Sequence, residues 1–203
     1  MARQPSDVKQ ERRQPQDARP AIEDGMNRQM SRPLRARPGL RDRTKGSVAA
    51  GAVLVPCALG RRGAAPAALK REGDGKTPLG TYRIVAVLYR PDRLLRPRTR
   101  LPVRALRPED GWCDDPRDGR YNRPVRLPIR ASAERMWRED GLYDLVLVLD
   151  HNGRPRARGR GSAVFLHVAG EGLTPTEGCV ALPLPALRRL LARLGPGARL
   201  RIG

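Results

Sequence analysis

The sequence predicts a mainly β (α+β) domain with one or two short helices and an amphipathic helix near the C-terminus. Apolar, β-branched runs recur along the chain between turns rich in Gly and Pro, and this alternation is typical of strands. By contrast, a sustained helical spacing of leucines occurs in the stretch 185–195. Aromatic residues make up 3% of the chain, so Leu, Val and Ala must fill the core.

The first 45 residues differ in kind from the rest. Residues 1–45 are rich in Arg, Gln, Pro and Asp and show almost no apolar periodicity. Such a segment buries too little apolar surface to offset its chain entropy, so we expect a disordered basic tail. Met30 is a candidate for the native start of translation. The remaining residues, 46–203, suit one folded domain.

The first half of this domain predicts two strands. The apolar run 52–57 indicates the first strand, and the residues at 73–80 form a turn-rich loop because they include three glycines and a proline. The Val-, Ile- and Tyr-rich run 81–90 predicts the next strand. The Pro- and Arg-rich stretch 91–108 is expected to form a loop or edge strands.

The second half predicts helices and a pair of strands. A serine in N-cap position favours a short helix over 132–140. The apolar runs 142–153 and 161–168 predict neighbouring strands. The stretch 185–195 has Pro near its first turn, a Leu stripe and a terminal Gly, so it predicts an amphipathic helix. Residues 198–203 close the domain as a strand.

The pair His167 and Cys179 is the most informative feature of the sequence. His167 stands near the end of an apolar strand, and the Gly- and Pro-rich loop 169–178 returns the chain to Cys179. A thiol attacks as thiolate and needs a base or cation beside it, so the two residues together can make a nucleophile. Gly178 directly before the cysteine leaves backbone N–H groups free for an oxyanion. The alternative is a small, buried, unreactive cysteine.

A second candidate region is the polar stretch 111–125. It holds Trp112, Asp114 and Tyr121 in what we expect to be a long loop, where exposed aromatic and acidic side chains often bind ligands. We therefore expect these three residues to form one wall of a substrate groove. The alternative is a turn in which Trp112 covers the edge of the core.

Two sequence elements together resemble the catalytic core of the L,D-transpeptidase family. The string Thr176-Glu177-Gly178-Cys179, after His167 and its loop, resembles the family's Ser/Thr-x-Gly-Cys motif. The string TPLGTY at 77–82 resembles its Thr-Pro-x-Gly-x-Tyr/Phe element, and the resemblance runs from roughly Leu54 to Ile202. Many members have His where this chain has Glu177, and a polar residue where it has Ala181, so the match is to a divergent Thr-Glu-Gly-Cys branch.

The resemblance implies a mixed β-sandwich and an acyl transfer on peptidoglycan stem peptides. Cys179 would be the nucleophile, His167 the proton donor and acceptor, and Gly178 the backbone donor to the oxyanion. The carbonyl of Val168 or Thr176 would orient the imidazole. An amine acceptor gives a cross-link, whereas water gives L,D-carboxypeptidase activity, and both stay open. Glu177 pairs with a substrate ammonium, pairs with an Arg, or caps the loop.

The net charge of +20 raises a different class of function, a basic nucleic-acid-binding protein. The arginines are spread along the chain without the aromatic interleaving of single-strand binders, so no specific nucleic acid is expected. Cys57, Cys113 and Cys179 lack C-x-x-C spacing and histidine partners, so we expect neither a metal nor another cofactor. Cys57 and Cys113 either form a disulfide or stay reduced and buried.

The resemblance and the sequence differ on localisation. The family implies the periplasm or cell envelope, where peptidoglycan lies. The apolar run 47–60 lies too deep in the chain for a signal peptide and is too short for a membrane span. From sequence alone we therefore expect a cytoplasmic protein without a transmembrane segment. The oligomeric state stays open.

Overall fold

A computed structural model of the chain describes Met1 and residues 33–203. Strands dominate its secondary structure, with one α-helix and two 3₁₀ turns in the described part, so the predicted mainly β, sandwich-like class is confirmed. The strands form two separate sheets. The helical elements are η1 (Ala67–Leu69), η2 (Glu171–Leu173) and α1 (Leu184–Leu191).

The large sheet wraps around the main core, and one long strand closes it on itself. Its strands are β1 (Leu34–Pro38), β2 (Lys45–Ala50), β3 (Val53–Ala58), β4 (Ala64–Pro66), β5 (Thr77–Tyr89), β6 (Val103–Ala105), β10 (Leu145–Leu149), β11 (Phe165–Val168), β12 (Val180–Leu182) and β13 (Arg199–Ile202). They follow the order β10-β11-β12-β3-β2-β1-β13-β5-β4, and β5 also pairs with β10. The first half of β5 pairs with β13 and its second half with β10, so β5 bends to close the ring.

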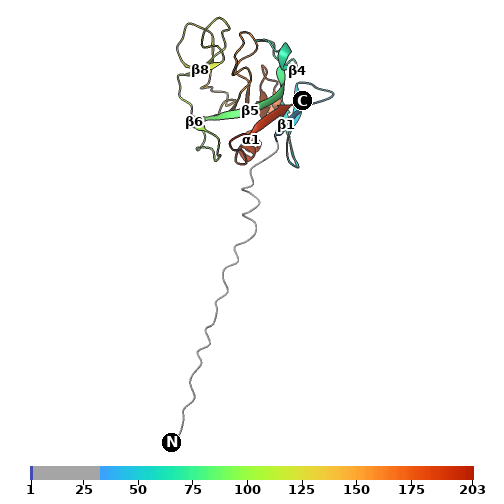
Figure 1. Cartoon of the computed structure of the whole chain (residues 1–203), viewed down its shortest axis with the longest axis vertical. Helices are drawn as coiled ribbons and strands as arrows, with labels where there is room; N and C mark the ends of the chain where they lie inside the picture. The colour runs from blue at the N-terminus through green and yellow to red at the C-terminus, as the bar shows by residue number, and fades with distance from the viewer. Residues whose placement is uncertain (2–32) are drawn as a thin grey trace.

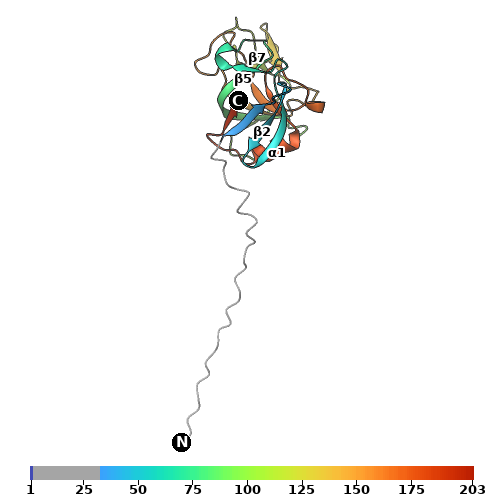
Figure 2. The ribbon, with the colours of Figure 1, turned by 90° about the vertical axis from the view of Figure 1, so that its right-hand side faces the viewer.

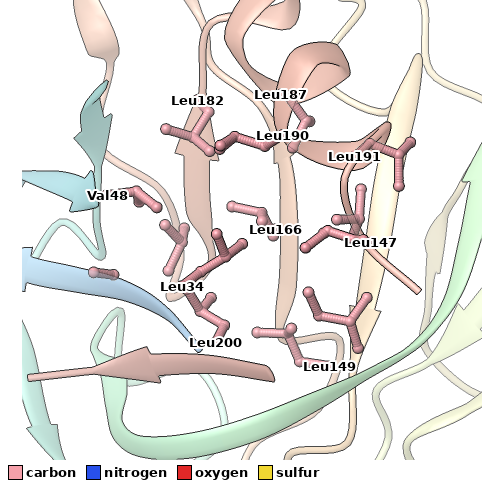
Figure 3. Packing of buried hydrophobic residues seen from close by; sticks show 14 of the residues in the cluster. Leu34, Val48, Leu147, Leu149, Leu166, Leu182, Leu187, Leu190, Leu191 and Leu200 are labelled. Carbon is pink, nitrogen blue, oxygen red and sulfur yellow. The ribbon is translucent and has the colours of Figure 1, made fainter. Parts of the chain in front are cut away.

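Leucines from strands far apart in the sequence fill the enclosed core (Figure 3). Leu34 of β1, Leu166 of β11 and Leu200 of β13 are fully buried there. The helix α1 packs its leucines Leu187 and Leu191 onto the same cluster. This helix and its Leu stripe are as the sequence predicts, because apolar residues at helical spacing fall on one face.

The small sheet covers the opposite face of β10 and β11. It consists of β7 (Asp110–Cys113) between β8 (Arg123–Arg126) and β9 (Ala133–Arg135). Figure 1 and Figure 2 place it at the other end of the domain from α1. Since side chains alternate along a strand, the residues of β10 and β11 that point away from the main core form a second apolar cluster beneath this sheet.

Three sequence expectations about elements are wrong. The stretch 132–140 contains strand β9 rather than a helix, because Glu134 pairs with Trp112 in the small sheet and this pairing overrides the local N-cap signal. Strand β5 already begins at Thr77, inside the predicted loop, since β4 pairs with that segment. The expected tail contains strand β1, whose Leu34 side chain is buried in the core. Residues 2–32, including Met30, lie outside the described residues.

Two further observations concern the cysteines and the membrane. Cys57 in β3 and Cys113 in β7 are both free, buried thiols, which corresponds to the reduced alternative. Among the described residues, α1 is the longest helix with eight residues, and none is long and apolar enough to cross a membrane.

Candidate active site

The strands β11 and β12 bring His167 and Cys179 to the same face of the large sheet. The two strands are parallel neighbours, with His167 opposite Ala181 and Leu166 opposite Val180. Cys179 immediately precedes β12, so it lies opposite Phe165, two positions before His167 on the adjacent strand. Alternate residues of a strand share a face, and both side chains therefore point toward the small sheet. The structure thus places the two residues on neighbouring segments of one sheet, and their catalytic role stays a prediction.

The imidazole of His167 is held in one tautomer. Its Nδ1 donates to the carbonyl of Val168 at 2.8 Å, because a carbonyl oxygen can accept but not donate. The N–H of Val168 in turn donates to the carbonyl of Leu142 at 3.1 Å, and the ring of Tyr143 packs edge-on against the imidazole at 5.3 Å. Burial lowers the pKa of His167 to about 4, so the ring is neutral at pH 7.

The thiol of Cys179 rests against the backbone of the neighbouring strand. Its Sγ donates to the carbonyl of Ala163 at 3.2 Å and accepts the N–H of Phe165 at 3.3 Å. Burial raises its pKa to about 12, with the Glu134 carboxylate adding to the rise, while the Phe165 N–H and the Lys70 ammonium oppose it. In the described part of the chain no hydrogen bond joins the thiol to His167. The resting site is therefore a neutral thiol beside a neutral imidazole.

Thr176 organises the loop before Cys179. Its hydroxyl donates to the carbonyl of Cys179 at 2.7 Å and accepts the N–H of Gly178 at 3.1 Å. The Gly178 N–H is thus occupied in the resting site, contrary to the expectation that it is free. The carbonyl of Thr176 accepts the N–H of Arg61 at 2.7 Å, so Val168 and not Thr176 orients the imidazole.

Glu177 points outward from this loop. Its two carboxylate oxygens each accept from Nε of Arg61 at 2.8 Å, and its side chain is 74% exposed. Of the three roles left open by the sequence, the structure has the ion pair with an arginine. The pair joins the loop before Cys179 to the turn between β3 and β4.

The expected groove wall is a strand and a packed turn rather than a long loop. Trp112 lies in β7, is half-buried, and packs edge-on against Phe165 with ring centroids 5.0 Å apart. Tyr121 is 2% exposed and donates its hydroxyl to Glu72 at 2.5 Å, so the expectation that it is exposed is wrong. Asp114 is half-buried, and within the described residues its Oδ1 has no hydrogen-bond partner. Trp112 thus contacts Phe165, the residue whose N–H donates to the thiol.

Sequence reasoning missed several side chains around Cys179. Thr77 donates its hydroxyl to the carbonyl of Cys179 at 3.3 Å. Glu134 accepts the hydroxyl of Tyr143 at 2.5 Å, beside the imidazole. Lys70 is buried near Gly178. A compositional signal was present for Lys70, because four of the 41 basic residues are lysines and two of these flank the loop before Thr77. Glu134 was missed because the stretch 132–140 was predicted to be a helix.

Comparison with models of protein families shows which family the chain belongs to. The model of the L,D-transpeptidase catalytic domain matches residues 43–202. The chain belongs to this family. Comparison with curated proteins and with solved structures gave no significant match. The L,D-transpeptidase family acts on peptidoglycan peptides, and the matched range contains every residue of the site described above.

Proposed function

We propose that the protein is an L,D-transpeptidase that acts on peptidoglycan stem peptides through a thioester on Cys179. The observation that carries the proposal is the oriented His167, whose Nδ1 is fixed on Val168 and which shares a face of the sheet with Cys179. This is the arrangement that general-base activation of a nucleophile requires. Because peptidoglycan lies outside the inner membrane, the proposed reaction takes place in the cell envelope.

The first half-reaction forms the thioester. The thiol leaves the Ala163 carbonyl, and its proton passes to Nε2 of His167. The sulfur attacks the carbonyl carbon of the third, L-configured residue of a stem tetrapeptide. The C–N bond to D-alanine then breaks, and the imidazolium returns the proton to the leaving amine. The second half-reaction reverses these roles: an amine of a neighbouring stem loses its proton to His167, attacks the thioester and releases the thiol.

The oxyanion of each tetrahedral intermediate needs a donor, and we assign the Gly178 N–H. In the resting site the Thr176 hydroxyl accepts this N–H at 3.1 Å and so keeps it satisfied. In other acyl-transfer enzymes one such donor contributes about 3 kcal/mol to the stability of the transition state.

The test is acylation by a carbapenem, followed by intact-mass measurement. We expect one adduct on the parent protein and none on Cys179→Ala. The matched control is Cys113→Ala, since Cys113 is also a buried free thiol but lies in the small sheet. An adduct that persists on Cys179→Ala contradicts the proposal.

A second measurement separates the fates of the acyl group. Incubation with disaccharide tetrapeptides is expected to give cross-linked dimers. Shortened stems without dimers assign the same site to an L,D-carboxypeptidase. Salt-dependent binding to nucleic acid, unchanged in Cys179→Ala and without any adduct on the parent, assigns the chain to the nucleic-acid-binding class instead.

A further inference from the structure

A buried ammonium group lies next to the candidate nucleophile. Lys70 is 3% exposed, which is rare for a lysine because a buried charge must be compensated. Its Nζ forms an ion pair with Asp74 and donates to the carbonyl of Arg71 at 3.0 Å. Asp74 also accepts the N–H of Lys76 at 2.9 Å. The pair therefore fixes the turn that precedes β5.

This turn packs directly behind the peptide that carries the nucleophile. A methyl group added at Gly178 would lie 3.5 Å from Nζ of Lys70 and 2.9 Å from the carbonyl oxygen of Lys76. Gly178 has φ +139°, which L side chains rarely adopt. Thr77, next in the chain, hydrogen-bonds to the carbonyl of Cys179. The glycine thus lets the Lys76 carbonyl approach more closely than a side chain would allow, and the Lys70 ammonium lies at van der Waals distance from the same position.

A second positive charge near the thiolate would add to that of the imidazolium. A thiolate is stabilised by a nearby positive charge, and in many cysteine enzymes an imidazolium supplies it. The His167 imidazole, neutral at rest, becomes an imidazolium only as the thiolate forms, and the charge of the Glu134 carboxylate in β9 opposes the thiolate. We propose that Lys70 is the fixed cation that stabilises the Cys179 thiolate once its proton has moved to Nε2 of His167. The inference rests on the proposed function and deepens it.

The charge of Asp74 allows the proposal to be tested by the direction in which the stability of the thiolate changes. The charged and titratable groups around Lys70 are its partner Asp74, the nearby His151 and, behind Gly178, Cys179 itself. Asp74 offsets part of the positive charge that the thiol experiences. Removing the ammonium should therefore disfavour the thiolate, whereas removing the Asp74 charge should favour it. A purely structural ion pair predicts that both changes act in the same direction.

The experiment measures the rate at which iodoacetamide alkylates Cys179 between pH 6 and 9, with peptide mapping to separate this thiol from Cys57 and Cys113. A nearby charge shifts a pKa by about one to three pH units. A thiolate also becomes a weaker nucleophile as its pKa falls, and this offsets part of the effect on the rate. We therefore expect Lys70→Met to react about three- to thirtyfold more slowly at pH 7.5, and Asp74→Asn to react faster by a similar factor. Lys70→Arg keeps the charge and should react within about twofold of the parent.

Each outcome decides for or against the proposal. Opposite changes in Lys70→Met and Asp74→Asn support it, and changes of the same sign, or none, overturn it. If thermal melting shows that Lys70→Met is unfolded, the direction of the Asp74→Asn change decides alone. Alkylation by iodoacetamide needs no peptidoglycan substrate. Its result therefore tests the role of Lys70 whether or not the carbapenem adduct forms. An adduct on the parent with unchanged alkylation in both variants overturns the role of Lys70 and leaves the transpeptidase assignment standing.

Discussion

The backbone N–H of Phe165 donates to the sulfur of Cys179 at 3.3 Å, two residues before His167 on the same strand. One strand, β11, therefore holds the thiol at its start and the imidazole near its end. Any shift of β11 against β12 changes both groups together, since the register of the two strands sets their separation. The resting thiol is hydrogen-bonded to the backbone rather than activated, and in the proposed mechanism the first event is its release from the Ala163 carbonyl.

The first prediction concerns His167 as the base. His167→Asn removes the group that takes the thiol proton, and proton transfer by a positioned side chain typically contributes about 10²–10⁴-fold to a rate. We expect carbapenem acylation of Cys179 to slow by a factor in this range while the melting temperature stays near that of the parent. Acylation at the parent rate would show that another group takes the proton.

The second prediction concerns stability at acidic pH. Burial lowers the pKa of His167 from 6.5 to about 4, so the unfolded chain binds a proton that the folded chain rejects between these values. The contribution of His167 to stability is full above pH 6.5 and is lost as pH falls toward 4, by about 3 kcal/mol in all. Urea unfolding at pH 7 and pH 4.5 measures it. In His167→Asn the difference between the two pH values should shrink, and an unchanged difference would contradict the prediction.

The sequence predicts the strands that carry the site because their apolar runs are long and β-branched. The runs around Leu147 and Leu166 each give a buried strand where periodicity alone predicts one. The same local logic fails at β9 and β1. Ala133 lies in a three-residue strand that pairs with β7, and Leu34 pairs with β13 at the far end of the chain as well as with the neighbouring β2, so tertiary pairing forms both strands where the local sequence has no run of apolar residues.

The candidate site was predictable to a similar extent. His167 and Cys179 are visible because residue type and spacing mark them. Lys70 and Glu134 come near Cys179 through folding of the turn before β5 and of the small sheet, so their positions depend on tertiary contacts. The hydrogen bond between Thr176 and Gly178 likewise depends on side-chain geometry that the motif does not contain.

The third prediction concerns Thr176. Thr176→Val keeps the shape of the side chain but removes the hydroxyl that bonds both Cys179 and Gly178. Leaving these backbone groups without partners should lower the free energy of unfolding by about 1–3 kcal/mol and slow acylation. Thr176→Ser retains the hydroxyl and is the matched control. Urea unfolding and the carbapenem rate measure the two effects, and a valine variant equal to the serine variant in both would contradict the prediction.

The fourth prediction separates two residues of the expected groove wall. Trp112 is half-buried against Phe165, so Trp112→Ala should open the space beside the thiol and raise KM for stem peptides. Tyr121 is buried with its hydroxyl on Glu72, so Tyr121→Phe should cost about 1 kcal/mol of stability and leave KM unchanged. Steady-state kinetics and urea unfolding of both variants test the distinction. A changed KM in Tyr121→Phe would return that residue to the groove wall.

The fifth prediction concerns Glu177 and Arg61. Both side chains are mainly exposed, and exposed ion pairs typically contribute about 0–1 kcal/mol, so we expect a coupling energy in this range from a double-mutant cycle of Glu177→Gln and Arg61→Gln. The kinetic effect distinguishes two roles. If the pair anchors the loop before Cys179, either single variant should slow acylation equally, because each breaks the same bond. If Glu177 instead binds a substrate ammonium, Glu177→Gln alone should raise KM, and Arg61→Gln should lower it by freeing the carboxylate. Since the ion pair already occupies both oxygens of Glu177, we expect the first pattern.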